Sequence, residues 1–414
     1  MPDRVGADSI AAIERLLRVT STSVDHPRRS PPQVLSAPTR SSLELAAEKL
    51  LLGFLPPALL IVLVAARYLV GRHLGFDYRP LWEASRHLFH GASPYPAPHA
   101  AALHDEQQFV YPPVAAVLAA PLAVFPFGVA AALFAALEVA ATVMTLRVLD
   151  VRDWRCYGVT FLWYPVLQNF LMGSITSLLA LGLAVVWRYR DDRRISTLIS
   201  AALIAAKVFL WPLLFWLAAT RRWRTAGRAL GLALAAVALS WALVGFGGLT
   251  TYPRLLDELS RLESWKSYSA VALGLVLGLS TGEARALAII AGAAVISAMF
   301  VVGYLRRDEA ESDRNTFVLA IAAAFLFSPI VWTHYLALLV VPIAINRRTL
   351  APLWFVPLAM WATTGQSDGH AWQVVIGVAV WSVVLGAALR TPRPLSAPQT
   401  RVTQPVLSLG VFGR

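Results

Sequence analysis

Apolar segments recur along this chain from Leu51 to Leu389, and short clusters of arginine separate many of them. A helix needs about 20 apolar residues to cross a bilayer, and Leu51–Val70 is the first stretch of that kind. Of the 414 residues, 57% are hydrophobic and 14% are charged, whereas about a quarter of the residues in a soluble domain are charged. The sequence therefore predicts an all-α polytopic membrane protein and excludes an ordinary soluble enzyme.

The arginine clusters indicate how the segments are threaded. Cytoplasmic loops are enriched in basic residues, so we place the clusters around Arg152, Arg193, Arg224 and Arg348 in the cytoplasm. This arrangement requires the proline-rich stretch Tyr111–Phe125 to lie along the membrane without crossing it. Both chain ends are then cytoplasmic, and several short segments pair as hairpins. The twelve predicted segments are Leu51–Val70, Phe127–Leu149, Cys156–Phe170, Ser174–Trp187, Ile195–Lys207, Val208–Ala219, Ala229–Gly248, Glu283–Leu305, Asn315–Phe327, Trp332–Asn346, Leu350–Thr364 and Ala371–Leu389.

The two ends of the chain differ from the middle in composition. Residues 1–50 and 390–414 are rich in Pro, Ser, Thr and Arg, and such segments bury too little apolar surface to fold. We expect two disordered cytoplasmic tails around one membrane domain, 51–389, in which residues 71–126 form an outer loop with interfacial helices. The net charge of +12 is explained by the cytoplasmic arginines, so membrane lipids are expected partners and nucleic acid is not.

No metal or cofactor site is predicted. The single cysteine, Cys156, excludes an intramolecular disulfide and a cysteine-rich metal site. Five of the eight histidines lie between residues 71 and 110, but only His87 and His90 have a helical i, i+3 spacing. That spacing alone is no metal signature.

Asp77 stands where the first apolar segment leaves the membrane. A carboxylate at that place can take a proton from a substrate hydroxyl if its neighbours tune its pKa. Asp is also a favoured N-cap, and here it would cap a helix over Tyr78–Phe89. The sequence leaves both roles open.

Lys207 is a lysine inside an apolar run. A lone ammonium there requires an anion, and phosphate suits such a point charge. The alternative is a lysine that extends its ammonium group to the membrane surface along its own apolar stem.

Three further polar residues fall at breaks between the predicted segments. His334 follows Ser328–Thr333 and is suited to binding phosphate or a sugar hydroxyl, or to moving a proton; a purely structural histidine is equally compatible. Gln168 and Asn169 stand near the apex of one hairpin. Their amides suit sugar hydroxyls, although Asn is also common in turns for backbone reasons. With Asp77 and Lys207 they indicate one cavity on the outer side, since polar groups within a membrane usually face a cavity or the bundle interior.

Several stretches of the chain carry a family resemblance. They are Asp77-Tyr78 with Trp82-Glu83-Ala84, Gly91-Ala92-Ser93-Pro94-Tyr95, Tyr111-Pro112-Pro113, Pro165-Val166-Leu167-Gln168-Asn169 with Gly173, Lys207 with Pro212 and Arg221-Arg222-Trp223, and Ser328-Pro329 with Trp332-Thr333-His334. In this order they resemble the polyprenyl-phosphate-sugar-dependent membrane glycosyltransferases of glycosyltransferase family 87, which have the GT-C fold. The resemblance extends over residues from about 70 to 345.

The resemblance implies an inverting hexosyltransferase of the plasma membrane whose active site faces outward. Its donor would be a polyprenyl-phosphate sugar, with mannose first and arabinofuranose second, and its acceptor a cell-envelope glycolipid or glycan. Asp77 resembles the family's catalytic carboxylate, and no metal or other cofactor is implied. The implied substrate-binding residues are Lys207, His334, Gln168, Asn169, Tyr111, Tyr268 and Ser269, the last two standing where the family typically has Asn-Gln-Ser.

Two other functions compete with the enzyme. Twelve segments with both ends inside also suit a secondary transporter of a small solute, although the two halves contain no evident repeat and the polar residues gather toward the outer face. A non-catalytic envelope or assembly protein is the third possibility.

Overall fold

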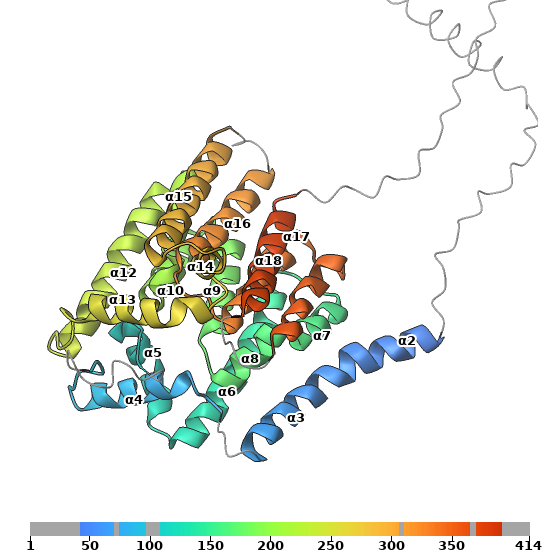
Figure 1. The fold of residues 1–414 in the computed structure, drawn as a ribbon, viewed down its shortest axis with the longest axis horizontal. Helices are drawn as coiled ribbons and strands as arrows, with labels where there is room; N and C mark the ends of the chain where they lie inside the picture. The colour runs from blue at the N-terminus through green and yellow to red at the C-terminus, as the bar shows by residue number, and fades with distance from the viewer. Residues whose placement is uncertain (1–41, 70–73, 97–107, 306–309, 365–369, 391–414) are drawn as a thin grey trace, which may run out of the picture. The chain divides into compact units, whose positions relative to one another are not determined.

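The computed structural model describes residues 42–69, 74–96, 108–305, 310–364 and 370–390, and within them all regular structure is helical (Figure 1). The predicted tails, apart from residues 42–50 and Arg390, lie outside the described residues. The helices are α2 (Ser42–Glu48), η1 (Lys49–Phe54), α3 (Leu55–Leu69), α4 (Tyr78–Phe89), α5 (Pro113–Ala123), α6 (Phe127–Val148), α7 (Trp154–Leu162), α8 (Tyr164–Met172), α9 (Thr176–Arg188), α10 (Arg193–Ala206), η3 (Val208–Leu210), α11 (Leu213–Ala219), α12 (Trp223–Leu243), α13 (Tyr252–Glu263), η4 (Ser264–Lys266), α14 (Ala270–Val276), α15 (Thr281–Leu305), α16 (Ala310–Phe327), η5 (Thr333–Leu339), α17 (Val340–Asn346), η6 (Pro352–Thr363) and α18 (Ala371–Ala388).

Two units are distinguished, residues 1–47 and residues 48–414, and the second contains every helix from η1 onward. The first unit contributes most of α2 to the described residues. Among the described residues, helical structure is present from Ser42, nine residues before the Leu51 at which the apolar run starts. The sequence placed Ser42–Lys49 in a tail because hydropathy locates apolar runs and not helix ends.

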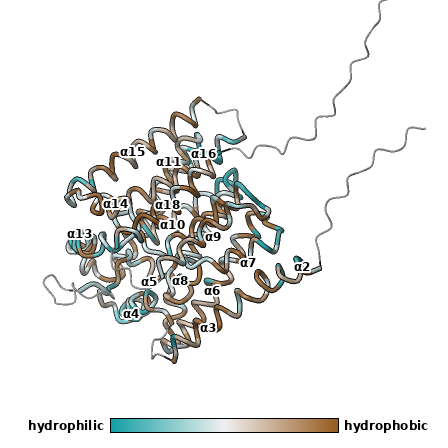
Figure 2. Tube along the Cα trace, turned by 45° about the vertical axis from the view of Figure 1, so that its right-hand side comes forward, coloured by the Kyte–Doolittle hydropathy of each residue, from teal (hydrophilic) through white to brown (hydrophobic). Residues whose placement is uncertain are grey.

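Five helical segments of the described chain are long and apolar enough to cross a membrane, and a sixth counts if α8 and α9 are taken as one bent span. The five are Ser42–Arg67, Phe127–Val148, Trp223–Leu243, Thr281–Leu305 and Ala371–Ala388. The prediction of an all-helical, polytopic membrane protein is therefore confirmed. The tube in Figure 2 is hydrophobic along most of these helices, whereas α4 and α13 are largely hydrophilic.

The other predicted segments are helical, and all except Asn315–Phe327, which lies in the 18-residue α16, correspond to shorter helices. The 14 residues of α10 rise about 21 Å at 1.5 Å per residue, less than the hydrocarbon thickness of about 30 Å. The predicted Cys156–Phe170 segment is interrupted, because α7 ends before Trp163 and α8 starts anew at Tyr164. The proline-rich stretch forms α5, whose 11 residues are too few to cross. Its location at the membrane surface remains a prediction.

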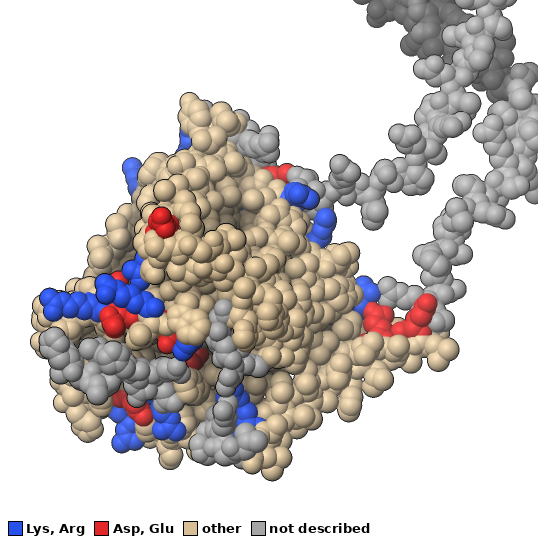
Figure 3. Space-filling view, in the orientation of Figure 1, with Lys and Arg blue, Asp and Glu red and all other residues tan. Residues whose placement is uncertain are grey.

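The outer surface of the long helices suits a lipid environment. α12 and α15 expose many large apolar side chains, among them Leu232, Leu234, Leu239, Ile289 and Ile290. In Figure 3 most of the visible face carries no charge, and charged side chains gather near α4 and α13 and at helix ends. Exposed apolar area on this scale is expected of a surface that contacts membrane lipid.

Ion pairs join several of the arginine clusters. Arg222, before α12, pairs with Asp191 at 2.7 Å and with Asp313 of α16 at 2.9 Å, and Arg190 pairs with the same Asp313 at 3.0 Å. Three turns or helix starts that are distant in sequence therefore meet at one end of the bundle. Helices α9, α10 and α16 each have one end here.

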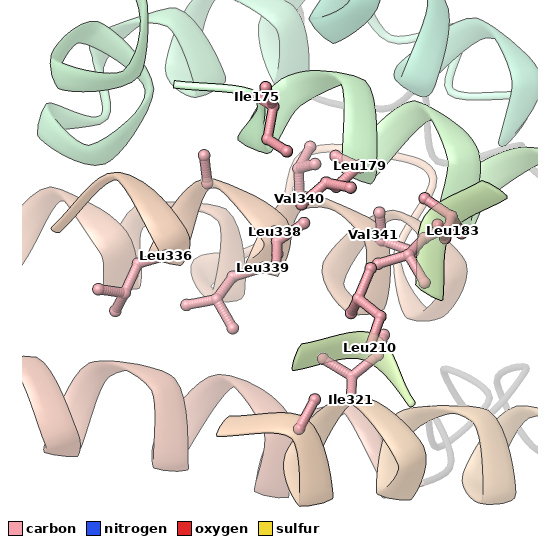
Figure 4. Packing of buried hydrophobic residues seen from close by; sticks show 14 of the residues in the cluster. Ile175, Leu179, Leu183, Leu210, Ile321, Leu336, Leu338, Leu339, Val340 and Val341 are labelled. Carbon is pink, nitrogen blue, oxygen red and sulfur yellow. The ribbon is translucent and has the colours of Figure 1, made fainter. Parts of the chain in front are cut away.

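An apolar core packs α9 against η5 and α17. Figure 4 shows Leu179 and Leu183 of α9 beside Val340 and Val341 of α17, and Leu338 of η5 lies next to Val340. All five side chains are almost fully buried, and η5 also packs against α8. Because interiors of this kind are close-packed, the start of η5 has a fixed place relative to the α8–α9 pair.

Candidate active site

The candidate site is built around a sharp bend between α8 and α9. The two helix axes differ by 117°, and α8 ends at Gly173, whose φ of +69° is in the left-handed region. A Cβ at this position would lie 2.8 Å from Tyr78 Cβ and 3.1 Å from Gly75 Cα. Glycine is therefore required both by the backbone conformation and by the close approach of the chain that enters α4.

Asp77 is held on this bend by its main chain. The N–H groups of Gly75 and Asp77 donate to the carbonyl oxygens of Leu171 and Met172 at 3.0 and 2.8 Å. Asp77 precedes α4, yet its φ of −76° and ψ of −22° are helical and its side chain makes no capping hydrogen bond. The capping role that the sequence left open is therefore not seen, and the carboxylate is available for another purpose.

The Asp77 carboxylate faces His334 at the start of η5. Asp77 Oδ2 lies 3.7 Å from His334 Nδ1, and the two side chains are 27% and 9% exposed. Burial raises the pKa of Asp77 from 3.8 to about 6, because a charged carboxylate loses solvation, while Lys207 and Arg67 act in the opposite direction. A base with a pKa near the working pH is effective in proton transfer.

Lys207 directly follows α10 and has an extended backbone, with φ of −147°. Its side chain is buried, and Nζ has no hydrogen-bond partner among the described residues. The ammonium lies 3.6 Å from the centroid of the Tyr335 ring and 5.5 Å from that of Tyr111. An ammonium extended to the surface is therefore not observed. A buried cation without a bonded anion is costly, and cation–π contacts compensate for part of that cost.

Tyr111 and Lys207 lie close together, and their contact with substrate remains a prediction. Tyr268 and Ser269 have other contacts. The Tyr268 N–H donates to Val331 O at 2.8 Å, and Ser269 Oγ donates to Pro329 O at 2.9 Å. Both residues therefore brace the segment that leads to His334. Substrate contact by Tyr268 and Ser269 remains a prediction.

The side chains of Gln168 and Asn169 point to different faces of α8. Successive residues of an α-helix point about 100° apart, so Asn169 is fully buried while Gln168 is partly exposed. Asn169 Nδ2 donates to the Glu138 carboxylate and to Ser177 Oγ, the latter at 2.8 Å. A role of either residue in binding sugar hydroxyls remains a prediction.

Two residues near the site escaped the sequence analysis. Tyr335, which carries the closer cation–π contact to Lys207, follows His334 directly in the chain. Glu138 lies in the middle of α6, fully buried, and acts electrostatically on Lys207 together with Asp77. The signal for Glu138 was present, since a carboxylate inside an otherwise apolar span usually faces a functional interior.

Residues 109–331, more than half of the chain, match the sequence profile described as glycosyltransferase family 87. The chain belongs to this family. Membership confirms the predicted enzyme class, glycosyltransferase, over the transporter and the non-catalytic alternatives. The matched range of this family 87 protein includes Tyr111, Glu138 and Lys207, whereas Asp77 precedes it by 32 residues and His334 follows it by three.

Curated relatives agree with the family. The family 87 protein is 27% identical over 324 residues to a polyprenol-phosphate-mannose-dependent alpha-(1-2)-phosphatidylinositol pentamannoside mannosyltransferase of Mycobacterium tuberculosis, covering 72% of this chain and 67% of the relative. It is 26% identical over 318 residues to the protein of the same description from Mycolicibacterium smegmatis, covering 71% of this chain and 70% of that relative. No solved structure matches the chain significantly.

The described part of this family 87 protein holds no group of three or more His, Cys, Asp or Glu side chains placed to share a metal ion. His73, His99 and His104 lie outside the described residues. A pocket of about 450 Å³ lies elsewhere in the fold, lined by Arg221, Trp223 and Tyr304 among others. It includes none of the predicted site residues, and the candidate site is therefore assigned from chemistry and not from pocket size.

Proposed function

We propose that this family 87 protein transfers a mannosyl residue from a polyprenyl-phosphate donor to a glycolipid or glycan of the cell envelope, with inversion at the anomeric carbon. The observation that carries this is that Asp77 and His334 face each other while Lys207 lies close enough to act electrostatically on both. Asp77 and His334 are 3.7 Å apart, and Lys207 supplies a buried ammonium without a hydrogen-bond partner among the described residues. Such a site combines a base with a cation for a phosphate.

The mechanism assigns one step to each group. The ionised Asp77 carboxylate takes the proton of the acceptor hydroxyl, and the resulting oxygen attacks the anomeric carbon of the donor sugar. A new glycosidic bond forms as the bond between that carbon and the phosphate oxygen breaks. The departing polyprenyl phosphate keeps the bonding electron pair, and Lys207, with His334 beside it, stabilises the negative charge that develops there.

Binding of the donor also explains why a lysine is buried in an apolar bundle. A desolvated ammonium gains most from an anion that reaches it in the same low-dielectric environment. The phosphate of a lipid-linked donor can approach from the bilayer, and Lys207 would then exchange its contacts with the rings of Tyr335 and Tyr111 for a charge-assisted hydrogen bond.

The orientation that we propose places the site outside and the arginine end inside. In support, Arg190 and Arg222 meet at Asp313, at the end of α9 and α16 opposite the end that carries the site, and basic residues favour the cytoplasm. The chain would then be a plasma-membrane protein of the GT-C type with about twelve membrane segments, several short or hairpin-like. Both termini would be cytoplasmic.

Mannose as the donor sugar is supported by the two mycobacterial relatives, which are described as polyprenol-phosphate-mannose-dependent. The test uses the purified protein in liposomes with radiolabelled polyprenyl-phosphate mannose and phosphatidylinositol mannosides as acceptors. We expect label in a larger glycolipid, and about 100- to 10,000-fold less label with an Asp77→Asn variant. Transfer from polyprenyl-phosphate arabinofuranose alone would overturn the choice of sugar, and no transfer from either donor would overturn the proposed reaction.

A further inference from the structure

Glu138 links α6, α8 and α9 at the bend that supports the site. It lies in the middle of α6 and is fully buried. Its Oε2 accepts hydrogen bonds from Asn169 Nδ2 of α8 and from the Ser177 N–H of α9, the latter at 3.2 Å. One carboxylate oxygen thus binds both arms of the 117° bend.

The contact with α9 has the character of a helix cap supplied from another helix. The first N–H groups of a helix lack partners within it, and Ile175, at the N-cap position of α9, provides no side-chain hydrogen bond. The Glu138 carboxylate takes that place, where a negative charge is also favoured by the helix dipole. Ser177 Oγ also links α9 to the other two helices. It accepts a hydrogen bond from Asn169 Nδ2 at 2.8 Å and one from Thr142 Oγ1 at 3.0 Å.

The same bend carries Asp77. Asn169 precedes Leu171 and Met172 on α8, and the carbonyl oxygens of those two residues hold the N–H groups of Gly75 and Asp77. A change in the tilt of α8 against α9 would therefore move the Asp77 backbone directly. Among the described residues no hydrogen bond or ion pair joins Glu138 to Asp77, so we infer that any influence on the position of Asp77 passes through the bend.

We propose that Glu138 is a positioning residue for Asp77: its carboxylate fixes the α8–α9 bend, and the bend places the Asp77 carboxylate against His334. As a statement about catalysis this inference rests on the proposed function. A misplacement of about 1 Å is enough to lower a rate by about 100-fold, so the fixed bend matters to catalysis although Glu138 touches no reacting atom.

Two matched substitutions distinguish the effect of the Glu138 side-chain length from that of its charge. Glu138→Gln keeps the length and one acceptor oxygen in the place of Oε2 but removes the charge. Glu138→Asp keeps the charge but is one methylene shorter, so the carboxylate is withdrawn from Asn169 and Ser177. We expect Glu138→Asp to lower kcat by about 10- to 100-fold with the donor KM little changed, and Glu138→Gln to retain most of the activity.

The opposite pattern would overturn the proposal. Because Glu138 also acts electrostatically on Lys207, a role through charge predicts that Glu138→Gln raises the donor KM while Glu138→Asp behaves as wild type. Equal loss in both variants, or no loss in either, would likewise contradict positioning. The matched control is Thr145→Val, since Thr145 is buried on the same helix and its hydroxyl donates, within the described part of the chain, to Ala141 O of that helix alone.

A double-mutant cycle tests whether the effect passes through Asp77. If it does, Glu138→Asp lowers the residual activity of an Asp77→Asn enzyme by no more than about twofold, because coupled residues are not additive. A full additional loss of 10-fold or more would mean that Glu138 acts on another group.

Amide hydrogen exchange over residues 74–80 gives a readout that does not need activity. Glu138→Asp should accelerate exchange at the Gly75 and Asp77 N–H groups, and Glu138→Gln should leave it unchanged. An unchanged rate in Glu138→Asp would refute the link between Glu138 and the bend. If wild-type protein transferred no sugar while this exchange pattern held, the proposed function would fail and the structural link would stand.

Discussion

Replacement of Asp77 by Asn tests the proton acceptor with little change in shape. The Asp77 side chain makes no capping hydrogen bond, and its main-chain bond to Met172 O at 2.8 Å does not depend on the carboxylate. The substitution therefore removes the base while it leaves the backbone of the site in place. General acid–base catalysis contributes about 100- to 10,000-fold, and we expect sugar transfer to fall by that range.

The same substitution should stabilise the protein at neutral pH. The pKa of Asp77 is raised from 3.8 to about 6, and each unit corresponds to about 1.4 kcal/mol, so the ionised carboxylate costs the fold up to about 3 kcal/mol. The folded state binds the Asp77 proton more tightly than the unfolded state does. The stability that the protonated carboxyl contributes is therefore fully present below pH 3.8 and is lost as the pH rises through about 6. The advantage of Asp77→Asn should therefore grow from pH 4 to pH 6 and remain constant above it.

Melting temperature and initial rate of transfer are measured on the same detergent-purified samples. Asp150→Asn is the control, since Asp150 pairs with Arg152 and Arg348 at the far end of α6, where its φ of +58° suits Asn equally well. For wild-type enzyme kcat/KM should rise with pH through about 6, as the carboxylate loses its proton. An Asp77→Asn enzyme with wild-type activity, or one that melts several degrees lower, would refute the general-base argument.

Three further outcomes are expected. Lys207→Ala should insert normally but raise the donor KM about 10- to 100-fold, as for the loss of a charge-assisted bond, with only partial recovery in Lys207→Arg; unchanged donor kinetics would exclude a phosphate contact. At fusion points after Arg194 and Arg348, a reporter enzyme that works only in the cytoplasm should be active, and one that works only in the periplasm should be inactive. The reverse result would invert the proposed topology. Gly377→Ala places a methyl group against the ring of Tyr268 and should cost about 1–3 kcal/mol of stability through overpacking, visible as a lower melting temperature in calorimetry.

The order of helices and breaks was largely determined by the sequence. Hydropathy is a local property, so apolar runs such as Phe127–Leu149 correspond to helices, here Phe127–Val148. The breaks at Gly173 and Lys207 were also visible, because glycine, proline and isolated charges interrupt apolar helices within a few residues. The residues Asp77, Lys207 and His334 could be selected on the same grounds, as polar groups at the ends of apolar segments.

Only the tertiary structure decided what those polar groups face. Asp is a favoured N-cap, but Asp77 has helical backbone angles and makes no capping hydrogen bond. Its main chain is bonded to Met172 O of α8, and its carboxylate faces His334. Likewise, Glu138 and Asn169 are 31 residues apart and meet where α6 packs against α8. Local patterns fix where a helix begins and ends, whereas the partners of its side chains depend on angles between helices, which arise from packing across the whole bundle.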